Sequence, residues 1–472
     1  MKWIRQIAAL SVLTLCCGSS AVLLAGDGSA KKSAPQVELE VKPVYGMLKA
    51  GEQQTTWIRV GLQGFKLESK KARANVNLAI VMDKSGSMQG EKIKRAREAA
   101  IDAIQLLSKD DIVSIVTYDS TVNVLVPATK LTDKQMVIDR IKQIQPKGNT
   151  ALFAGVSKGA AEVRKFLDKE RVNRVILLSD GLANVGPASP GELGDLGKSM
   201  IEENISVSTL GLGLGYNEDL MAQLAKTSGG NHLFIEEASE LADIFRSEFD
   251  DVLSVVAQEV DVTVTIPKGI RPVRVLGNAA EVNGQQIVTR LAQIYSEQDR
   301  HVVIEVELPA NETAAKLQLA KVKVTYANMK SHESDELSGK TVIAFSDDAK
   351  TVEASLNSDV LADVVALVSS EQNKLATKFL DEGNLVGCRI VLDNNAEFLK
   401  VNAIKCPDDA ERLNQLSLQN STWFSVLDGV KSKDAPAANS VRKSFRGYQS
   451  AVDQQQRVKS PQKKEASQPN SR

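Results

Sequence analysis

The spacing of hydrophobic residues changes several times along this chain of 472 residues, and each change indicates a different kind of structure. Apolar and polar residues alternate in residues 36–65 and again in residues 258–348, which predicts antiparallel strands with one solvent-facing side. Between them, residues 75–257 alternate short apolar runs with stretches of helical spacing. Residues 357–430 have helical spacing again. Two to four domains are expected, because a chain of this length exceeds the size of a single core.

The segment 75–257 is predicted to be an α/β domain with a doubly wound, mainly parallel sheet. The apolar runs 77–83 and 172–179 suit strands that are buried on both faces, and helical stretches separate the successive runs. In a doubly wound sheet the first and fourth strands are neighbours where the strand order reverses. The loops that follow these two strands are therefore expected to meet at one crevice.

The segments that flank the α/β domain are predicted to form separate layers. Residues 258–348 have a usual size for a β-sandwich. The strands within 36–65 are barely stable as a pair, so we expect them to join that sandwich, with the α/β domain inserted between its parts. Residues 357–430 predict a helical hairpin that is broken between Gly383 and Gly387.

The last segment, 431–472, is basic and rich in Gln and Ser, so we expect it to be disordered. A solvated end is the simpler interpretation of this composition. Contact between the basic tail and a membrane surface or a cell-wall polymer is the alternative.

The first 25 residues have the anatomy of an export signal, with Lys2 and Arg5 ahead of an apolar core and small residues after it. An uncleaved anchor is less favoured, because the apolar core is short for a bilayer span. Lipidation at Cys16 or Cys17 is a second choice, since Leu15 stands where a lipidation motif has a small residue. We therefore expect a periplasmic or cell-surface protein.

Charge and cysteine content exclude several classes of protein. The formal net charge of −1 gives no reason to expect a nucleic-acid partner. No second stretch has the length of a membrane helix, so a channel or transporter is not expected. Beyond the signal only Cys388 and Cys406 remain, which are too few for a disulfide scaffold or a zinc site. We expect them to be unbridged, because they lie near opposite ends of one predicted helix.

Polar residues with oxygen side chains gather at three predicted loops. The motif Asp83-x-Ser85-x-Ser87 ends the first apolar strand, Thr150 opens a helix, and Asp180 ends the second apolar strand. Mg²⁺ suits such a set of oxygen donors, with Mn²⁺ or Ca²⁺ as alternatives, and the set contains no His or Cys. A role without metal is the other interpretation, in which Asp83 caps a helix and Ser87 lies in a turn.

The charge of this set predicts what else would bind there. Two carboxylates and three neutral hydroxyls leave an open coordination position on a divalent ion, and that position would attract an acidic group from outside. Helices that begin after Gly90 and Thr150 direct their positive dipole ends to the same place, which also favours an anion. The expected partner is a protein with an exposed Asp or Glu.

The region from about 77 to 257 resembles a von Willebrand factor type A (VWA) domain, and its metal-ion-dependent adhesion site is matched at every position. The resemblance implies that the serine and threonine hydroxyls contact the ion directly and that the aspartates hold it mostly through water. The matching residues are Asp83, Ser85, Ser87, Thr150 and Asp180.

The wider chain, with its flanking β segments and the stretches LSDGLANVG and GLGLGYNEDLM, is similar to exported bacterial proteins labelled calcium-activated-chloride-channel-like. No channel function is implied, because membrane spans are not predicted.

Two other functions compete with this interpretation. An enzyme is disfavoured: a phosphotransferase of the haloacid dehalogenase type would have an aspartate at Ser85, no P-loop occurs, and the glycines at 211–215 follow a late strand with the wrong spacing for a dinucleotide. The second is a structural envelope scaffold in which the ion only tethers loops. The sequence favours an exported, non-enzymatic binding or adhesion protein.

Overall fold

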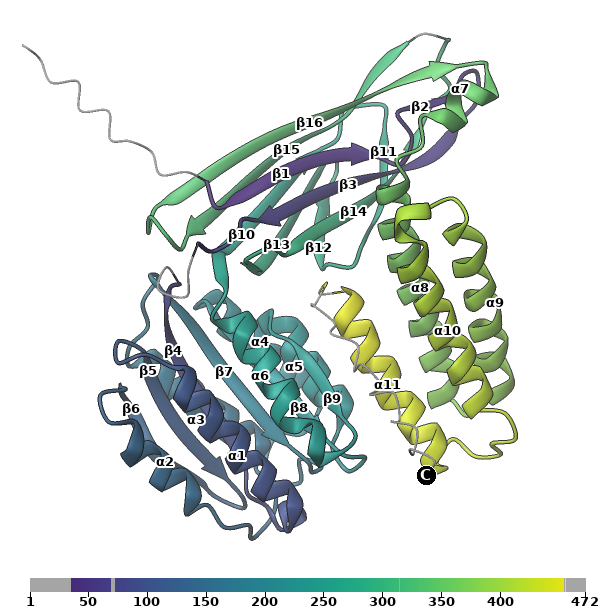
Figure 1. Ribbon diagram of the computed structural model, residues 1–472. Helices are drawn as coiled ribbons and strands as arrows, with labels where there is room; N and C mark the ends of the chain where they lie inside the picture. The colour runs from purple at the N-terminus through teal and green to yellow at the C-terminus, as the bar shows by residue number, and fades with distance from the viewer. Residues whose placement is uncertain (1–34, 69–72, 314, 454, 456–472) are drawn as a thin grey trace, which may run out of the picture. The chain divides into compact units, whose positions relative to one another are not determined.

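The computed structural model of the chain describes residues 35–68, 73–313, 315–453 and 455 (Figure 1). The predicted signal segment 1–25 and both candidate lipidation sites lie outside these ranges. Among the helices of the described ranges, none combines the length and the apolar composition needed to cross a membrane.

The central unit is a six-stranded sheet with the strand order β6-β5-β4-β7-β8-β9. Strand β4 pairs in parallel with both β5 and β7, and only β6 is antiparallel to its neighbour. This confirms the predicted doubly wound fold, including the pairing of the first and fourth strands. The strands are β4 (Asn75–Asp83), β5 (Ile112–Tyr118), β6 (Val122–Lys130), β7 (Arg171–Ser179), β8 (Ile205–Leu212) and β9 (His232–Ile235).

Helices cover both faces of this sheet, and the alternation of side chains along β4 explains why. Leu78, Ile80 and Met82 pack in one core with α1, α2 and α6, whereas Ala79 and Val81 pack in another with α3, α4 and α5. Successive residues of a strand point to opposite faces, so a continuous apolar run requires cover on both. The helices are α1 (Glu91–Leu106), α2 (Lys134–Lys142), α3 (Leu152–Arg164), α4 (Pro190–Glu202), α5 (Glu218–Ser228) and α6 (Leu241–Val252).

A β-sandwich is built from segments on both sides of the α/β unit. Its sheets have the orders β1-β3-β14-β11 and β12-β13-β10-β15-β16-β2, and β3 pairs with β14 from Gln54 to Gln63. Strands that precede and follow the α/β unit therefore share one sheet. The strands are β1 (Val37–Pro43), β2 (Met47–Lys49), β3 (Gln54–Gly64), β10 (Val255–Thr265), β11 (Arg271–Leu276), β12 (Ala280–Asn283), β13 (Gln286–Tyr295), β14 (Asp299–Leu308), β15 (Lys316–Asn328) and β16 (Ser334–Ser346).

The C-terminal helices correct one expectation. The segment expected to be a disordered tail contains a helix, α11, because Val441 and Phe445 form an apolar face that packs against Trp423, with the rings of Phe445 and Trp423 4.6 Å apart. Cys388 and Cys406 are free, as expected. The helices are α7 (Ala349–Ala354), α8 (Ser358–Asp381), α9 (Leu385–Ala403), α10 (Ala410–Val426) and α11 (Pro436–Asp453).

A buried histidine predicts how this fold responds to acid. His232 in β9 is 1% exposed, and its Nδ1 lies 2.9 Å from the Thr209 hydroxyl. Burial lowers the pKa of His232 to about 4, while Glu218 opposes this shift. Below its ordinary pKa the unfolded chain takes up a proton that the folded chain does not, so stability falls as the pH falls from about 6.5 to about 4.

We therefore expect His232 to cost the folded chain about 3 kcal/mol over that window. Urea unfolding at several pH values would show a smaller loss of stability on acidification for His232→Gln than for wild type. His332→Gln, at an exposed histidine, is the control and should keep the wild-type pH dependence. Equal pH dependence in His232→Gln and wild type would contradict this prediction.

Candidate metal centre

Three loops meet at the carboxyl edge of the central sheet. Asp83 is the last residue of β4, Asp180 follows β7, and Thr150 precedes α3. Backbone hydrogen bonds join the first and second loops: the Gly86 amide donates to the Gly148 carbonyl at 3.0 Å, and the Lys147 amide donates to the Lys84 carbonyl at 2.7 Å. The side chains predicted from sequence are therefore brought to one place by the parallel neighbours β4 and β7.

The aspartates and serines of the motif are connected to one another. The Ser87 hydroxyl donates to Asp180 Oδ1 at 2.7 Å, and the hydroxyls of Ser85 and Ser87 are 3.0 Å apart. Asp83 Oδ1 accepts the Ser85 amide at 2.8 Å. Asp83 and Asp180 are 0% and 1% exposed, whereas Ser87 is exposed. The oxygen cluster thus has a buried acidic floor and one hydroxyl at the surface.

Thr150 joins the cluster across Gly181. A Cβ atom on Gly181 would lie 3.0 Å from Thr150 Oγ1 and 3.4 Å from Ser87 Oγ. The Thr150 amide donates to Asn184 Oδ1 at 2.9 Å, which fixes the loop that carries it. The missing side chain of Gly181 keeps the space between the two hydroxyls open, which is where a cation ligated by both would need to lie.

The two buried carboxylates of the cluster favour a bound cation. Burial raises the pKa of Asp83, the nearby Asp180 adds to this effect, and hydrogen bonds from Ser85 and Ser179 oppose it. The Lys92 ammonium forms an ion pair with Asp180. Two buried carboxylates of like charge are costly without a positive partner. A divalent ion fits this donor set, in competition with Lys92 for Asp180.

The structure adds residues that the sequence analysis did not single out. Ser179 donates to Asp83 Oδ2 at 2.7 Å. Its position directly before Asp180 is the feature of the sequence that could have pointed to Ser179. Lys92 lies in the first turn of α1, directly after the motif. Lys84 forms a buried ion pair with Asp119, which no sequence pattern indicated. Of these residues, Ser179 and Lys92 contact candidate ligands directly, at Asp83 and Asp180.

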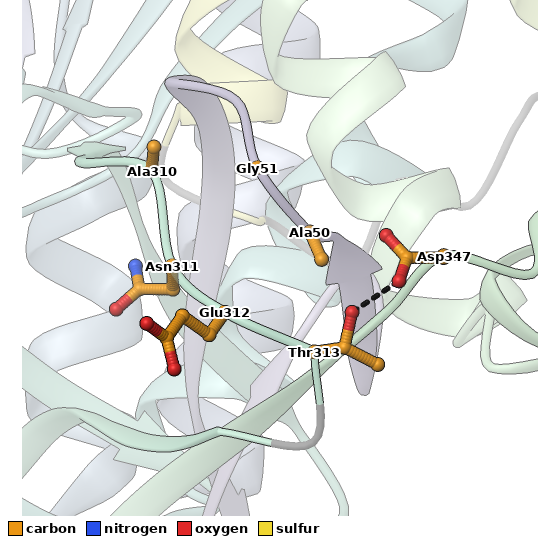
Figure 2. A pocket seen from close by; sticks show the side chains of 7 residues that line it. All are labelled: Ala50, Gly51, Ala310, Asn311, Glu312, Thr313 and Asp347. Carbon is orange, nitrogen blue, oxygen red and sulfur yellow. Dashed lines mark hydrogen bonds between the residues drawn. The ribbon is translucent and has the colours of Figure 1, made fainter.

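An open pocket of about 420 Å³ lies away from this cluster, on the β-sandwich. Figure 2 shows Thr313 hydrogen-bonded to Asp347 at one end of it and Asn311 with Glu312 at the other. None of its lining residues is a histidine, a cysteine or a basic residue. The pocket therefore lacks the usual partners of a nucleophile.

Comparison with known proteins shows which family the α/β unit matches and how much of the chain its relatives share. Residues 77–247 match the family model of the von Willebrand factor type A domain. Protein sll0103 of Synechocystis is 22% identical over 384 residues, which cover 78% of this chain and 89% of that protein. Protein YfbK of Escherichia coli K12 is 28% identical over 44% of this chain and 36% of its own length. Inter-alpha-trypsin inhibitor heavy chain H2 of Mus musculus is 32% identical over 33% of this chain and 17% of its own length. The chain thus spans only a minor part of these last two relatives.

Solved structures share the arrangement over most of the chain. A von Willebrand factor type A protein from Catenulispora acidiphila has a TM-score of 0.67 at 16% identity and covers 89% of this chain and 96% of its own. The ArnB paralog VWA2 from Sulfolobus acidocaldarius has a TM-score of 0.58 at 18% identity and covers 89% and 98%. At these identities the likeness shows the fold. The α/β unit of this chain is therefore a von Willebrand factor type A domain.

Proposed function

We propose that this chain is an exported, non-enzymatic binding protein whose VWA domain holds a divalent cation and uses it to capture a carboxylate of a protein partner. The ion, Mg²⁺ with Mn²⁺ or Ca²⁺ as alternatives, would be held by five side chains. These are Asp83, Ser85, Ser87, Thr150 and Asp180.

The observation that carries the proposal is the placement of these oxygen atoms. The carboxylates of Asp83 and Asp180 are buried, while Ser87 is exposed, so an ion bound among them would have one side toward solvent. Two carboxylates and three neutral hydroxyls suit a hard cation and leave a position for an outside oxygen ligand. A glutamate or aspartate of a partner protein would supply that ligand.

Two further features support the proposal. The sequence relatives include inter-alpha-trypsin inhibitor heavy chains, which match this chain over 176 and 165 residues. We infer export from the signal-like composition of the first 25 residues, and an exported binding site would lie in the periplasm or at the cell surface. A scaffold that uses the ion only to tether its loops is the competing function.

Capture of a partner tests this function directly. With Mg²⁺ present, immobilised wild-type chain should retain a protein from envelope extract, and EDTA should release that protein. The Thr150→Ala chain should retain at most about a tenth of the amount that wild type retains. Thr132→Ala, at an exposed threonine of the same domain, is the matched control and should behave as wild type. Retention that survives both EDTA and Thr150→Ala would refute carboxylate capture and favour the scaffold.

A further inference from the structure

We propose that Asp299, His301 and Asp363 form a second divalent-metal site, of the zinc class, where strand β14 meets helix α8. One ligand atom from each of these residues lies within 4.8 Å of the others. Asp299 and His301 are two residues apart on β14, so their side chains point to the same face of that strand. The inference is independent of the VWA domain, because none of these residues belongs to it.

His301 supplies the observation that points to a ligand. The residue is 6% exposed, and its Nδ1 has no hydrogen-bond partner among the described residues. This nitrogen lies 3.5 Å from Asp363 Oδ2. A buried polar atom without a partner is costly. A cation between Nδ1 and the carboxylate would satisfy both.

The surroundings attract cations. Asp299 and Asp363 line a pocket of about 360 Å³ in which carboxylates outnumber guanidinium groups by six to two. The additional acidic residues on its wall are Glu38, Glu40, Asp359 and Asp409. This opening gives an ion a route to the site and leaves room for a water ligand.

Arg59 is the internal competitor of the proposed ion. Its guanidinium donates to Asp363 Oδ2 at 2.6 Å and to Asp299, and it lies 3.6 Å from Glu40. The group lies over Gly61, where a Cβ atom would be only 2.1 Å from Arg59 Nη1. Since Glu40 is already within reach, Arg59 can keep an acidic partner when an ion takes its place between the two aspartates. The affinity for the ion therefore depends on how readily Arg59 leaves Asp299 and Asp363 for Glu40.

The donor set selects the class of metal. One imidazole nitrogen with two carboxylates suits Zn²⁺ or a similar transition ion, whereas Mg²⁺ and Ca²⁺ favour oxygen ligands alone. Three protein ligands leave a fourth position for water. An ion bound here would join β14 of the sandwich to α8 of the helical region.

Zinc titration of the full chain tests the site. Calorimetry on chains that carry Asp83→Ala, so that the first site is disabled, should show one zinc ion bound per chain. Adding His301→Ala or Asp299→Asn should weaken this binding about tenfold or more. Asp359→Asn, a carboxylate of the same pocket outside the ligand set, is the matched control and should bind as before.

Two further measurements keep the outcome decisive. Co²⁺ bound in place of zinc should give a visible absorption band that His301→Ala removes, and circular dichroism shows whether each variant is folded. If His301→Ala fails to fold, His301→Gln replaces it. Arg59→Lys, which keeps the charge and loses the planar fork, should tighten zinc binding. Equal zinc affinity in the parent, His301 and Asp299 chains, or no zinc binding at all, would overturn the proposal.

Discussion

Saturating Mg²⁺ is expected to stabilise the wild-type chain against unfolding by about 4.1 kcal/mol when the ion is at about 1,000 times its dissociation constant. Asp83→Ala should abolish this effect, because Asp83 is fully buried beneath the hydroxyl cluster and accepts hydrogen bonds from both Ser85 and Ser179. Unfolding in urea, measured in EDTA and again with Mg²⁺, Mn²⁺ or Ca²⁺, checks the prediction. The same series ranks the three ions.

A variant at Lys92 tests whether this residue competes with the ion for Asp180. Its ammonium pairs with Asp180 and would compete with an arriving ion. Lys92→Ala removes that competitor and leaves every candidate ligand in place, so the stabilisation at a fixed low Mg²⁺ concentration should increase. A wild-type chain that unfolds identically in EDTA and in all three ions would show that the cluster holds no ion without its partner. The scaffold function would then lose its metal as well.

Arg174→Met is expected to destabilise the chain by about 3–5 kcal/mol, the usual cost of leaving a buried charge without its partner. Arg174 in β7 is 0% exposed, and Glu248 of α6 lies 3.7 Å away and is 1% exposed. The guanidinium also donates to Gln293 at 2.6 Å and to the Tyr295 hydroxyl at 2.9 Å, both on β13 of the sandwich. Urea unfolding of the variant measures the loss.

Two companion variants separate charge from packing. The double variant Arg174→Met/Glu248→Gln lacks the unpaired carboxylate, so it should be more stable than the single variant Arg174→Met. Arg246→Met, at a half-exposed arginine of α6, should change stability by no more than about 0.5 kcal/mol. If Arg174→Met unfolds at the wild-type urea concentration, the contacts of Arg174 with Glu248, Gln293 and Tyr295 contribute no net stability.

Local pattern was sufficient to predict the α/β domain. The continuous apolar run at β4 requires cover on both faces, and the structure has helices on both. The helix α11 was missed because its apolar residues Val441 and Phe445 are few within a basic, Gln-rich segment. Their contact with Trp423 of α10 supplies the burial that composition alone did not indicate.

Some residues of the candidate metal centre could be predicted from the sequence, and others only from the tertiary structure. Asp83, Ser85 and Ser87 stand in one short motif, and Thr150 and Asp180 occur at predicted loop positions, so these five residues could be named from spacing. The hydrogen bond from Ser179 to Asp83 and the ion pair of Lys92 with Asp180 join residues 96 and 88 positions apart. No local pattern encodes such partners, because they are brought together only when the sheet closes.

Apart from α11, the sequence by itself determined whether each of these segments becomes helix or strand, since strand and helix periods and a short oxygen-rich motif are properties of neighbouring residues. The tertiary structure decided which segments meet. Pairing of β3 with β14 joins residues from before and after the VWA domain, and α8 brings Asp363 to Asp299 and His301. These contacts close loops of hundreds or dozens of residues, and their free energy comes from burial that exists only once the layers have packed.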